Sequence, residues 1–103
     1  MEKSKTERGF ELSSFEDYYG DACELQKSSL ATKDCIWLGL KNVNARVMAK
    51  HAEHFGIEVS NKTGWVDYPI PDGVFIGTRM HLDREQVKEL LPYLQKFVDT
   101  GEI

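Results

Sequence analysis

Two neighbouring side chains, Arg79 and His81, offer the clearest recognition chemistry in this sequence. They alternate with Met80 and Leu82 in an extended segment, so we expect Arg79 and His81 to share one face of a strand. Guanidinium and imidazole groups bind carboxylate, phosphate and amide oxygens through directed hydrogen bonds. Three further polar residues would complete the surface if their segment lies alongside: Gln26, Ser28 and Ser29. The pattern predicts a binding surface for an anionic or amide-rich ligand.

Two aromatic side chains, Trp65 and Tyr68, lie in a segment punctuated by glycine and proline. Aromatic residues presented by a loop can line a pocket or a protein interface. The alternative is that they cover the second face of a sheet. Trp37 lies instead in the apolar run 35–40, which favours a place in the core.

The segment 11–24 carries acidic residues and no lysine or arginine. Its acids are Glu11, Glu16, Asp17, Asp21 and Glu24. The simplest interpretation is a solvated edge and turn. The alternative is an acidic interface for a basic partner protein.

Few residues have the spacing of a metal or catalytic site. His51 and His54 share a helical face at i and i+3 and could ligate zinc, but a third ligand, such as His81 or a cysteine, would have to come from a distant segment. Cys23 and Cys35 lie in predicted strands, where they should be small core residues without a disulfide. No phosphate loop, dinucleotide fingerprint or metalloprotease motif is present. We predict a protein that is not an enzyme and needs no cofactor or metal.

The bulk properties limit the class of protein. A chain of 103 residues is sized for one domain, and we expect a flexible tail over 1–8 and a single domain over 9–103. A formal net charge of −4 argues against direct DNA binding. No apolar run is long enough to span a membrane, and the polar N-terminus lacks a signal peptide's apolar region. These features predict a cytoplasmic location, with the cysteines reduced.

Hydrophobic periodicity and turn residues predict the main elements. The segments 22–27 and 35–40 should be strands of one hairpin, and apolar spacing predicts a helix over 42–55 that ends at Gly56. Asp83 and Gln86 have the spacing of a capping box at the start of a C-terminal helix that ends at Gly101. Pro92 predicts a kink, or a second helical segment beginning there.

The C-terminal helix carries a long apolar stripe. Its members are Val87, Leu90, Leu91, Leu94, Phe97 and Val98. The predicted fold is therefore α+β, with a small antiparallel sheet of three to four strands packed by this helix and a long insertion at about 41–76 that contains a short helix. If the stripe is buried, a charge at Leu91 or Leu94 should unfold the domain.

Several short motifs resemble a group of bacteriophage and prophage proteins of uncharacterised function. They are Phe15-x-Asp17-x-Tyr19-Gly20, Gln26-x-Ser28-Ser29, Ile36-Trp37-Leu38-Gly39 and Arg79-Met80-His81-Leu82-x-x-Glu85-Gln86-Val87. The resemblance spans most of 9–103 and implies a small accessory protein made inside an infected bacterium. Small phage accessory proteins often act by binding, including as inhibitors of host defence.

The leading hypothesis is therefore a non-enzymatic binding protein, with host defence inhibition as its role. One version blocks a basic host protein, such as the nucleic-acid-binding surface of a CRISPR effector, and the other sequesters a small nucleotide ligand through Arg79, His81 and aromatic stacking. A first alternative is a zinc-dependent or zinc-stabilised module built on His51 and His54. A second is a structural phage protein that forms a homodimer or larger homo-oligomer through an exposed edge strand and the 65–68 aromatics.

Overall fold

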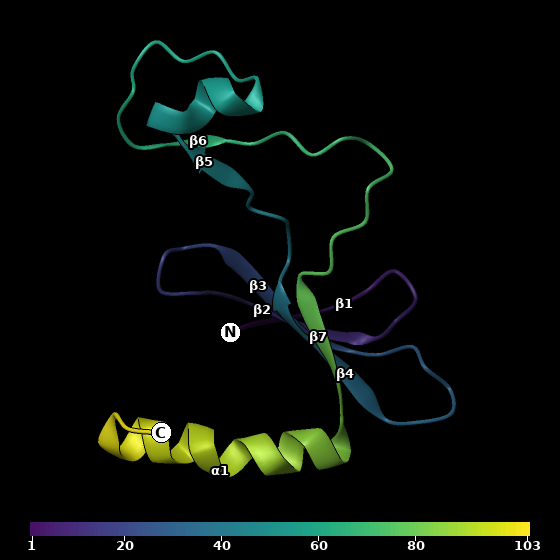
Figure 1. Ribbon diagram of the computed structural model, residues 1–103. Coiled ribbons are helices and arrows are strands. Elements are labelled where there is room, and N and C mark those ends of the chain that lie inside the picture. The colour runs from purple at the N-terminus through teal and green to yellow at the C-terminus, as the bar shows by residue number, and fades with distance from the viewer. The chain divides into compact units, whose positions relative to one another are not determined.

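A computed structural model describes residues 1–103, which divide into two compact units. The sheet unit comprises Met1–Asn42 and Gly77–Ile103, and the hairpin unit comprises Val43–Ile76. Figure 1 shows the hairpin unit as the teal and green part of the chain, with strands β5 and β6.

The sheet unit consists of an antiparallel five-stranded sheet and one α-helix, which confirms the α+β class. The strands run in the order β1-β2-β3-β4-β7, and their bounds are β1 Glu2–Lys5, β2 Glu11–Glu16, β3 Ala22–Lys27, β4 Cys35–Leu40 and β7 Arg79–Asp83. The helix α1 spans Arg84–Thr100. The sheet thus has more strands than the three to four expected, and the additional strand is β1.

Strand β1 lies within the segment expected to be a flexible tail, and that expectation is wrong for Glu2–Lys5. The strand pairs antiparallel with β2, with Lys5 opposite Glu11. The turn between the two strands is closed by the Gly9 N–H, which donates to the Thr6 carbonyl at 2.9 Å. The prediction failed because β1 has no apolar residue, so its order comes from backbone pairing that leaves no hydrophobic signal in the sequence.

The strand register divides the sheet into two chemically different faces. One side, the apolar face, carries Phe15, Cys23, Leu25, Ile36, Leu38, Leu40, Met80 and Leu82. The other side, the polar face, carries Glu24, Gln26, Trp37, Arg79 and His81. The alternation follows from the two-residue period of a strand.

The capping box at the start of α1 is confirmed. The Gln86 N–H donates to Oδ1 of Asp83 at 2.9 Å, and the Asp83 N–H donates to Oε1 of Gln86 at 3.0 Å. The helix continues through Pro92 as one element of 17 residues, so no second helical segment begins there. Gly101 ends it in the left-handed conformation (φ 76°), as expected.

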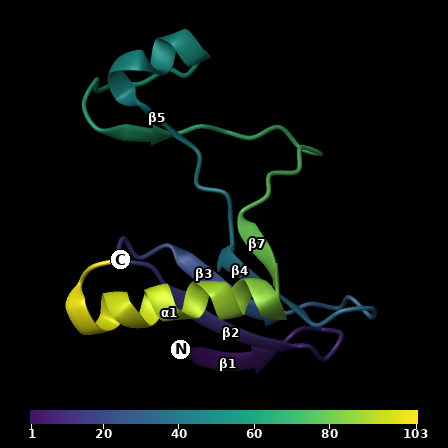
Figure 2. The same ribbon diagram turned by 60° about the horizontal axis from the view of Figure 1, so that its bottom comes forward.

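The helix α1 lies beside the sheet at its start, near β4, but its apolar stripe is not buried as expected. No residue of α1 is buried, and Leu91 and Leu94 are 60% and 50% exposed. The physical reason is the junction: β7 ends at Asp83 and α1 begins at the next residue, with no intervening loop (Figure 2). Only the first turns of the helix approach the sheet. A charge at Leu91 or Leu94 should therefore not unfold the domain, because neither side chain is buried in the core of its own chain.

The Asp83 carboxylate links the loop before β4 to this helix start. The Nζ of Lys33 lies 2.9 Å from Oδ2 of Asp83, and this hydrogen bond, followed by the backbone N–H of Gln86, lowers the pKa of Asp83. The same pair raises the pKa of Lys33. The carboxylate is therefore more stable in the folded protein than in the unfolded chain.

Acid should weaken the helix start through this group. A carboxyl whose folded pKa is lowered contributes stability above its unfolded pKa and loses it as the pH falls through the folded value. We expect wild-type unfolding free energy to fall below about pH 4 with a larger slope than that of Asp83→Asn, which keeps a capping oxygen but has no charge to titrate. Urea unfolding followed by circular dichroism at stepped pH measures this difference. Equal slopes for wild type and Asp83→Asn would contradict a contribution of the Asp83 carboxylate to acid unfolding.

The hairpin unit pairs β5 (Arg46–Met48) with β6 (Trp65–Asp67), and a 3₁₀ helix, η1 (Ala49–Phe55), follows β5. The helix predicted over 42–55 is thus wrong for its first half. Val47, counted there as a helical apolar position, pairs with Val66 across the hairpin. Ala49 and Ala52 are buried three residues apart, which matches the three-residue turn of a 3₁₀ helix. Gly56 ends η1 in the left-handed conformation, as expected.

Candidate functional site

The polar face of the sheet brings side chains from three adjacent strands into one row. Gln26 of β3 lies opposite Trp37 of β4, and Trp37 lies opposite His81 of β7. The Trp37 and His81 rings stack, with centroids 4.0 Å apart and an angle of 15° between planes. The Nε2 of His81 is 2.9 Å from the Ser28 hydroxyl just beyond β3. Cross-strand pairing therefore fixes the orientation of the imidazole.

The next row of the polar face leaves a gap that Arg79 fills. Gly39 lies between Glu24 and Arg79 in the register and has no side chain. The Arg79 Nη1 donates to Oε1 of Gln26 at 2.7 Å and lies 4.0 Å from Oε1 of Glu24. Its guanidinium carbon is 5.4 Å from the centre of the Trp37 ring, within cation–π range. The guanidinium is thus held in place by an amide, a carboxylate and an indole.

These side chains form what we call the polar cluster: Glu24, Gln26, Ser28, Trp37, Arg79 and His81. All of them are anchored on, or directly beside, paired strands, so the cluster is ordered before any ligand arrives. The other guanidinium nitrogens of Arg79 carry N–H donors that match carboxylate or phosphate oxygens. The arrangement suits the binding of an anionic group beside aromatic surfaces.

Ser28 and His81 have the separation of a nucleophile and its base, but the surroundings of Ser28 favour a structural role. Ser28 is only 4% exposed, and its hydroxyl accepts the Leu30 N–H at 3.2 Å. Its backbone N–H also donates to the Cys35 carbonyl at 3.0 Å. The hydroxyl therefore shapes the start of the β3–β4 loop and orients His81. Burial also keeps a substrate from reaching the Ser28 hydroxyl, which argues against a role as nucleophile.

Several residues proposed from the sequence as a binding surface come together here. Gln26, Ser28, Arg79 and His81 all belong to the polar cluster, while Ser29 is exposed at the start of the adjoining loop. Sequence reasoning missed Trp37, because an apolar run does not reveal which of its residues face the polar side. The signal that could have found it is strand register, since a hairpin with Gln26 opposite Trp37 puts both on one face.

The other two proposed aromatics belong to the hairpin unit. Trp65 is 63% exposed on β6. Tyr68 follows β6, where its N–H donates to the Ala45 carbonyl and its ring meets the edge of Phe55 at 6.0 Å between centroids. Tyr68 therefore packs within the hairpin unit, while Trp65 presents its indole to solvent.

The acidic residues of 11–24 do not gather on one surface. Glu11 has the register of the apolar face, opposite Lys5, whereas Glu16 and Glu24 have that of the polar face. Asp17 lies in the β2–β3 turn, where its Oδ1 accepts the N–H groups of Tyr19 and Asp21 at 2.9 Å. Asp17 therefore stabilises a turn, and Glu24 lies beside Arg79 in the polar cluster.

The histidine and cysteine candidates lie in different parts of the fold. His51 and His54 lie on η1, and the His54 ring meets the edge of Phe55 at 5.3 Å. No group of three histidine, cysteine or acidic side chains within residues 1–103 is placed to hold a metal ion. Cys23 and Cys35 are buried free thiols, opposite Leu40 and Asp83 respectively. Burial, followed by the charge of Asp17, raises the pKa of the Cys23 thiol.

Comparison with known proteins adds no relative: no protein-family model, curated protein or solved structure matches this chain. The resemblance to short phage proteins therefore stays a prediction. No helix of the structure has the length and apolar character needed to cross a lipid bilayer.

Proposed function

We propose that this chain is a non-enzymatic binding protein whose polar cluster holds a small anionic ligand of the nucleotide class. The observation that carries the proposal is the position of the Arg79 guanidinium, fixed by Gln26 at 2.7 Å and lying beside the stacked Trp37 and His81 rings. A fixed guanidinium can bind phosphate oxygens, and the neighbouring ring edges and faces can contact a base. The resemblance to phage accessory proteins supports a role in which the ligand is a host signal, sequestered to inhibit defence.

Two observations favour this version over a block of a basic host protein. The acids expected to form an interface divide between both faces of the sheet and a turn. By contrast, the cationic and aromatic residues lie within hydrogen-bond or ring-contact distance of one another. A ligand smaller than a nucleic acid strand also fits the net charge of −4, because long-range repulsion acts most strongly on a polyanion.

Replacing the guanidinium should weaken ligand binding. We expect Arg79→Gln to reduce the affinity for the best ligand of a mono- and dinucleotide panel by about 10- to 100-fold, the range for losing a charged hydrogen-bond partner. Isothermal titration calorimetry with wild type and variant measures the change. Arg84→Gln is the matched control, because Arg84 begins α1 and lies outside the polar cluster.

Two outcomes would contradict the proposal. One is wild-type protein that binds no member of the panel, with inorganic phosphate included as the smallest anion. The other is equal affinity for Arg79→Gln and Arg84→Gln, which would show that the ligand responds to positive charge anywhere on the sheet unit and not to a specific contact with Arg79. Binding that falls as salt rises would be expected for a contact to phosphate.

A further inference from the structure

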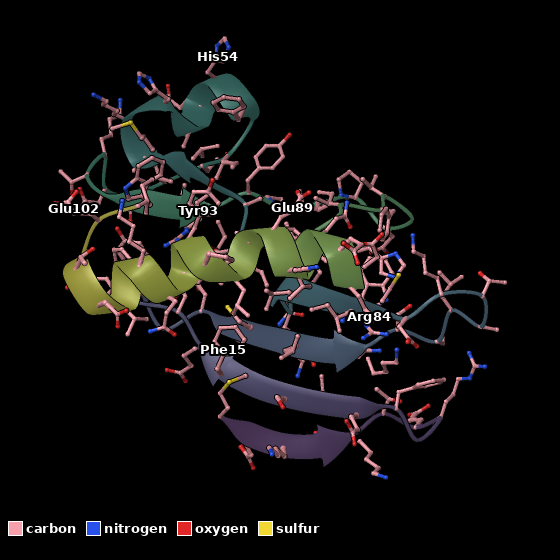
Figure 3. The ribbon with its side chains drawn as sticks, turned by 90° about the horizontal axis from the view of Figure 1, so that it is seen from below. Phe15, His54, Arg84, Glu89, Tyr93 and Glu102 are labelled. Atoms are coloured by element: carbon pink, nitrogen blue, oxygen red, sulfur yellow. The ribbon has the colours of Figure 1, made fainter.

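The apolar stripe of α1 and the apolar face of the sheet lie on the same side of the sheet unit, and each is incompletely covered. Among the stripe residues, Leu91, Phe97 and Val98 are 60%, 57% and 76% exposed. On the sheet, Met80 is 52% exposed, and Leu25 and Leu38 are half-buried. Figure 3 shows Phe15, another member of the apolar face, projecting toward the helix side. Exposed apolar surfaces of this extent are typical of interaction sites.

An open groove separates the two surfaces near the start of the helix. It has a volume of about 570 Å³, and its apolar lining includes Ile36 from β4 and Val87 and Leu91 from α1. Charged side chains, including Lys27 and Asp34, lie at its rim. The chain does not fill this space itself.

The junction between β7 and α1 limits how the helix can approach its own sheet. Connections between packed elements usually need two to six residues, and here there are none. The helix direction is also fixed by the Asp83–Gln86 capping box and by the Lys33–Asp83 ion pair. Closing the groove from within would require these contacts to break, so another chain is better placed to cover it.

We propose that this cover is a second copy of the chain, joined by a two-fold axis, with α1 of each copy on the apolar face of the other's sheet. A sheet with one apolar face and a helix with one apolar stripe are the two layers of a standard α+β core. Each copy offers both layers, so an exchange about a two-fold axis satisfies all four surfaces at once. The polar cluster lies on the other face of the sheet, and this proposal does not depend on its ligand.

The area fits a stable homodimer. The exposed part of the helix stripe is on the order of 400 Å², on the basis of the usual apolar surface of such side chains. Each stripe would cover a similar area on the partner sheet. Two stripes and two sheet areas would then bury on the order of 1,600 Å² in the dimer, the size of a standard specific interface.

The charges bordering the helix stripe also permit self-association. Arg84 and Lys88 alternate with Glu85 and Glu89 along the first turns of α1, so this part of the helix carries no net charge. The groove rim likewise contains both Lys27 and Asp34, which form an ion pair at 3.2 Å. Two such borders can meet without accumulating like charge, although each whole chain carries −4.

Sedimentation equilibrium of the full chain tests the proposal. At about 100 µM, above the dissociation constants usual for an interface of this size, wild type should have twice the monomer mass of 11.8 kDa. Leu94→Asp on the helix and Met80→Asp on the sheet should each weaken association by at least about 30-fold, as expected for a charge placed in an apolar interface. Lys96→Glu, on the opposite side of α1 by helical period, is the control and should remain dimeric.

Each other outcome overturns the proposal. A wild-type mass of 11.8 kDa across the concentration range would mean that no second copy covers the groove. A Leu94→Asp variant that remains dimeric would place the interface elsewhere. A Leu94→Asp variant that loses its circular dichroism signal, with Met80→Asp still dimeric, would mean that α1 packs within its own chain.

Discussion

The Gly39→Ala variant is expected to melt about 20 °C below wild type, the largest single-residue effect in the sheet unit. Two costs of about 1–3 kcal/mol each combine, one for backbone strain and one for steric overlap, and a domain of this size loses about 4–8 °C per kcal/mol. Gly39 has φ 152°, which L-residues rarely adopt. An added Cβ would lie 2.5 Å from the Thr78 carbonyl oxygen and 2.9 Å from the Arg79 Cα.

The obstruction at Gly39 is backbone, so no side-chain rotation can relieve it. β4 and β7 would have to separate where Thr78 accepts the Leu40 N–H and donates its hydroxyl to the Leu40 carbonyl. Differential scanning calorimetry measures the shift. Gly20→Ala is the matched control, because Gly20 has φ 87° but open space around the added Cβ, and it should lose only about 5 °C. Equal shifts in the two variants would contradict the close approach at Gly39.

The second large effect is expected in the hairpin unit, where Ala52→Asp should abolish the fold of Val43–Ile76. Ala52 is fully buried (0% exposed), and an unpaired carboxylate there costs several kcal/mol. A unit shorter than about 40 residues has little stability to lose. The sheet unit should remain folded, because all pairs of its five strands lie outside Val43–Ile76.

The two tryptophans report on this variant separately, since Trp37 belongs to the sheet unit and Trp65 to the hairpin unit. In a ¹⁵N–¹H spectrum of Ala52→Asp, the Trp65 indole and the 43–76 amides should move to unfolded positions, while the Trp37 indole keeps its shift. His51→Asp is the control, because it adds one negative charge at the exposed neighbouring position. Loss of both indole signals would mean that the units fold as one, and loss of neither would refute the packing of η1.

Much of the fold could be predicted where a local rule acts alone. The hairpin strands 22–27 and 35–40 are confirmed at their full length as β3 and β4. The capping box at Asp83 and the glycines at 56 and 101 mark helix ends through backbone chemistry that depends on a few neighbouring residues. Alternation likewise placed Arg79 and His81 on one face of a strand.

What could not be predicted depends on partners that are remote in sequence. Val47 fits a helical stripe as well as a strand, and its pairing with Val66 decides between them. Trp37 fits a core run, and only the register with Gln26 and His81 puts it in the polar cluster. Leu94 belongs to an apolar stripe that periodicity predicts to be covered, but periodicity does not reveal whether the cover is in the same chain, and Leu94 is 50% exposed in this one.

The first strand of the sheet has a consequence for solubility. β1 is an edge strand of the sheet and pairs only with β2, so the backbone N–H and C=O groups on its outer side have no strand partner. Such an edge invites a foreign strand to add, and charged side chains, lysine above all, discourage the addition. Glu2, Lys3 and Lys5 supply those charges. These charged side chains thus oppose fibre-like growth, because a strand that added to β1 would have to remove water from them.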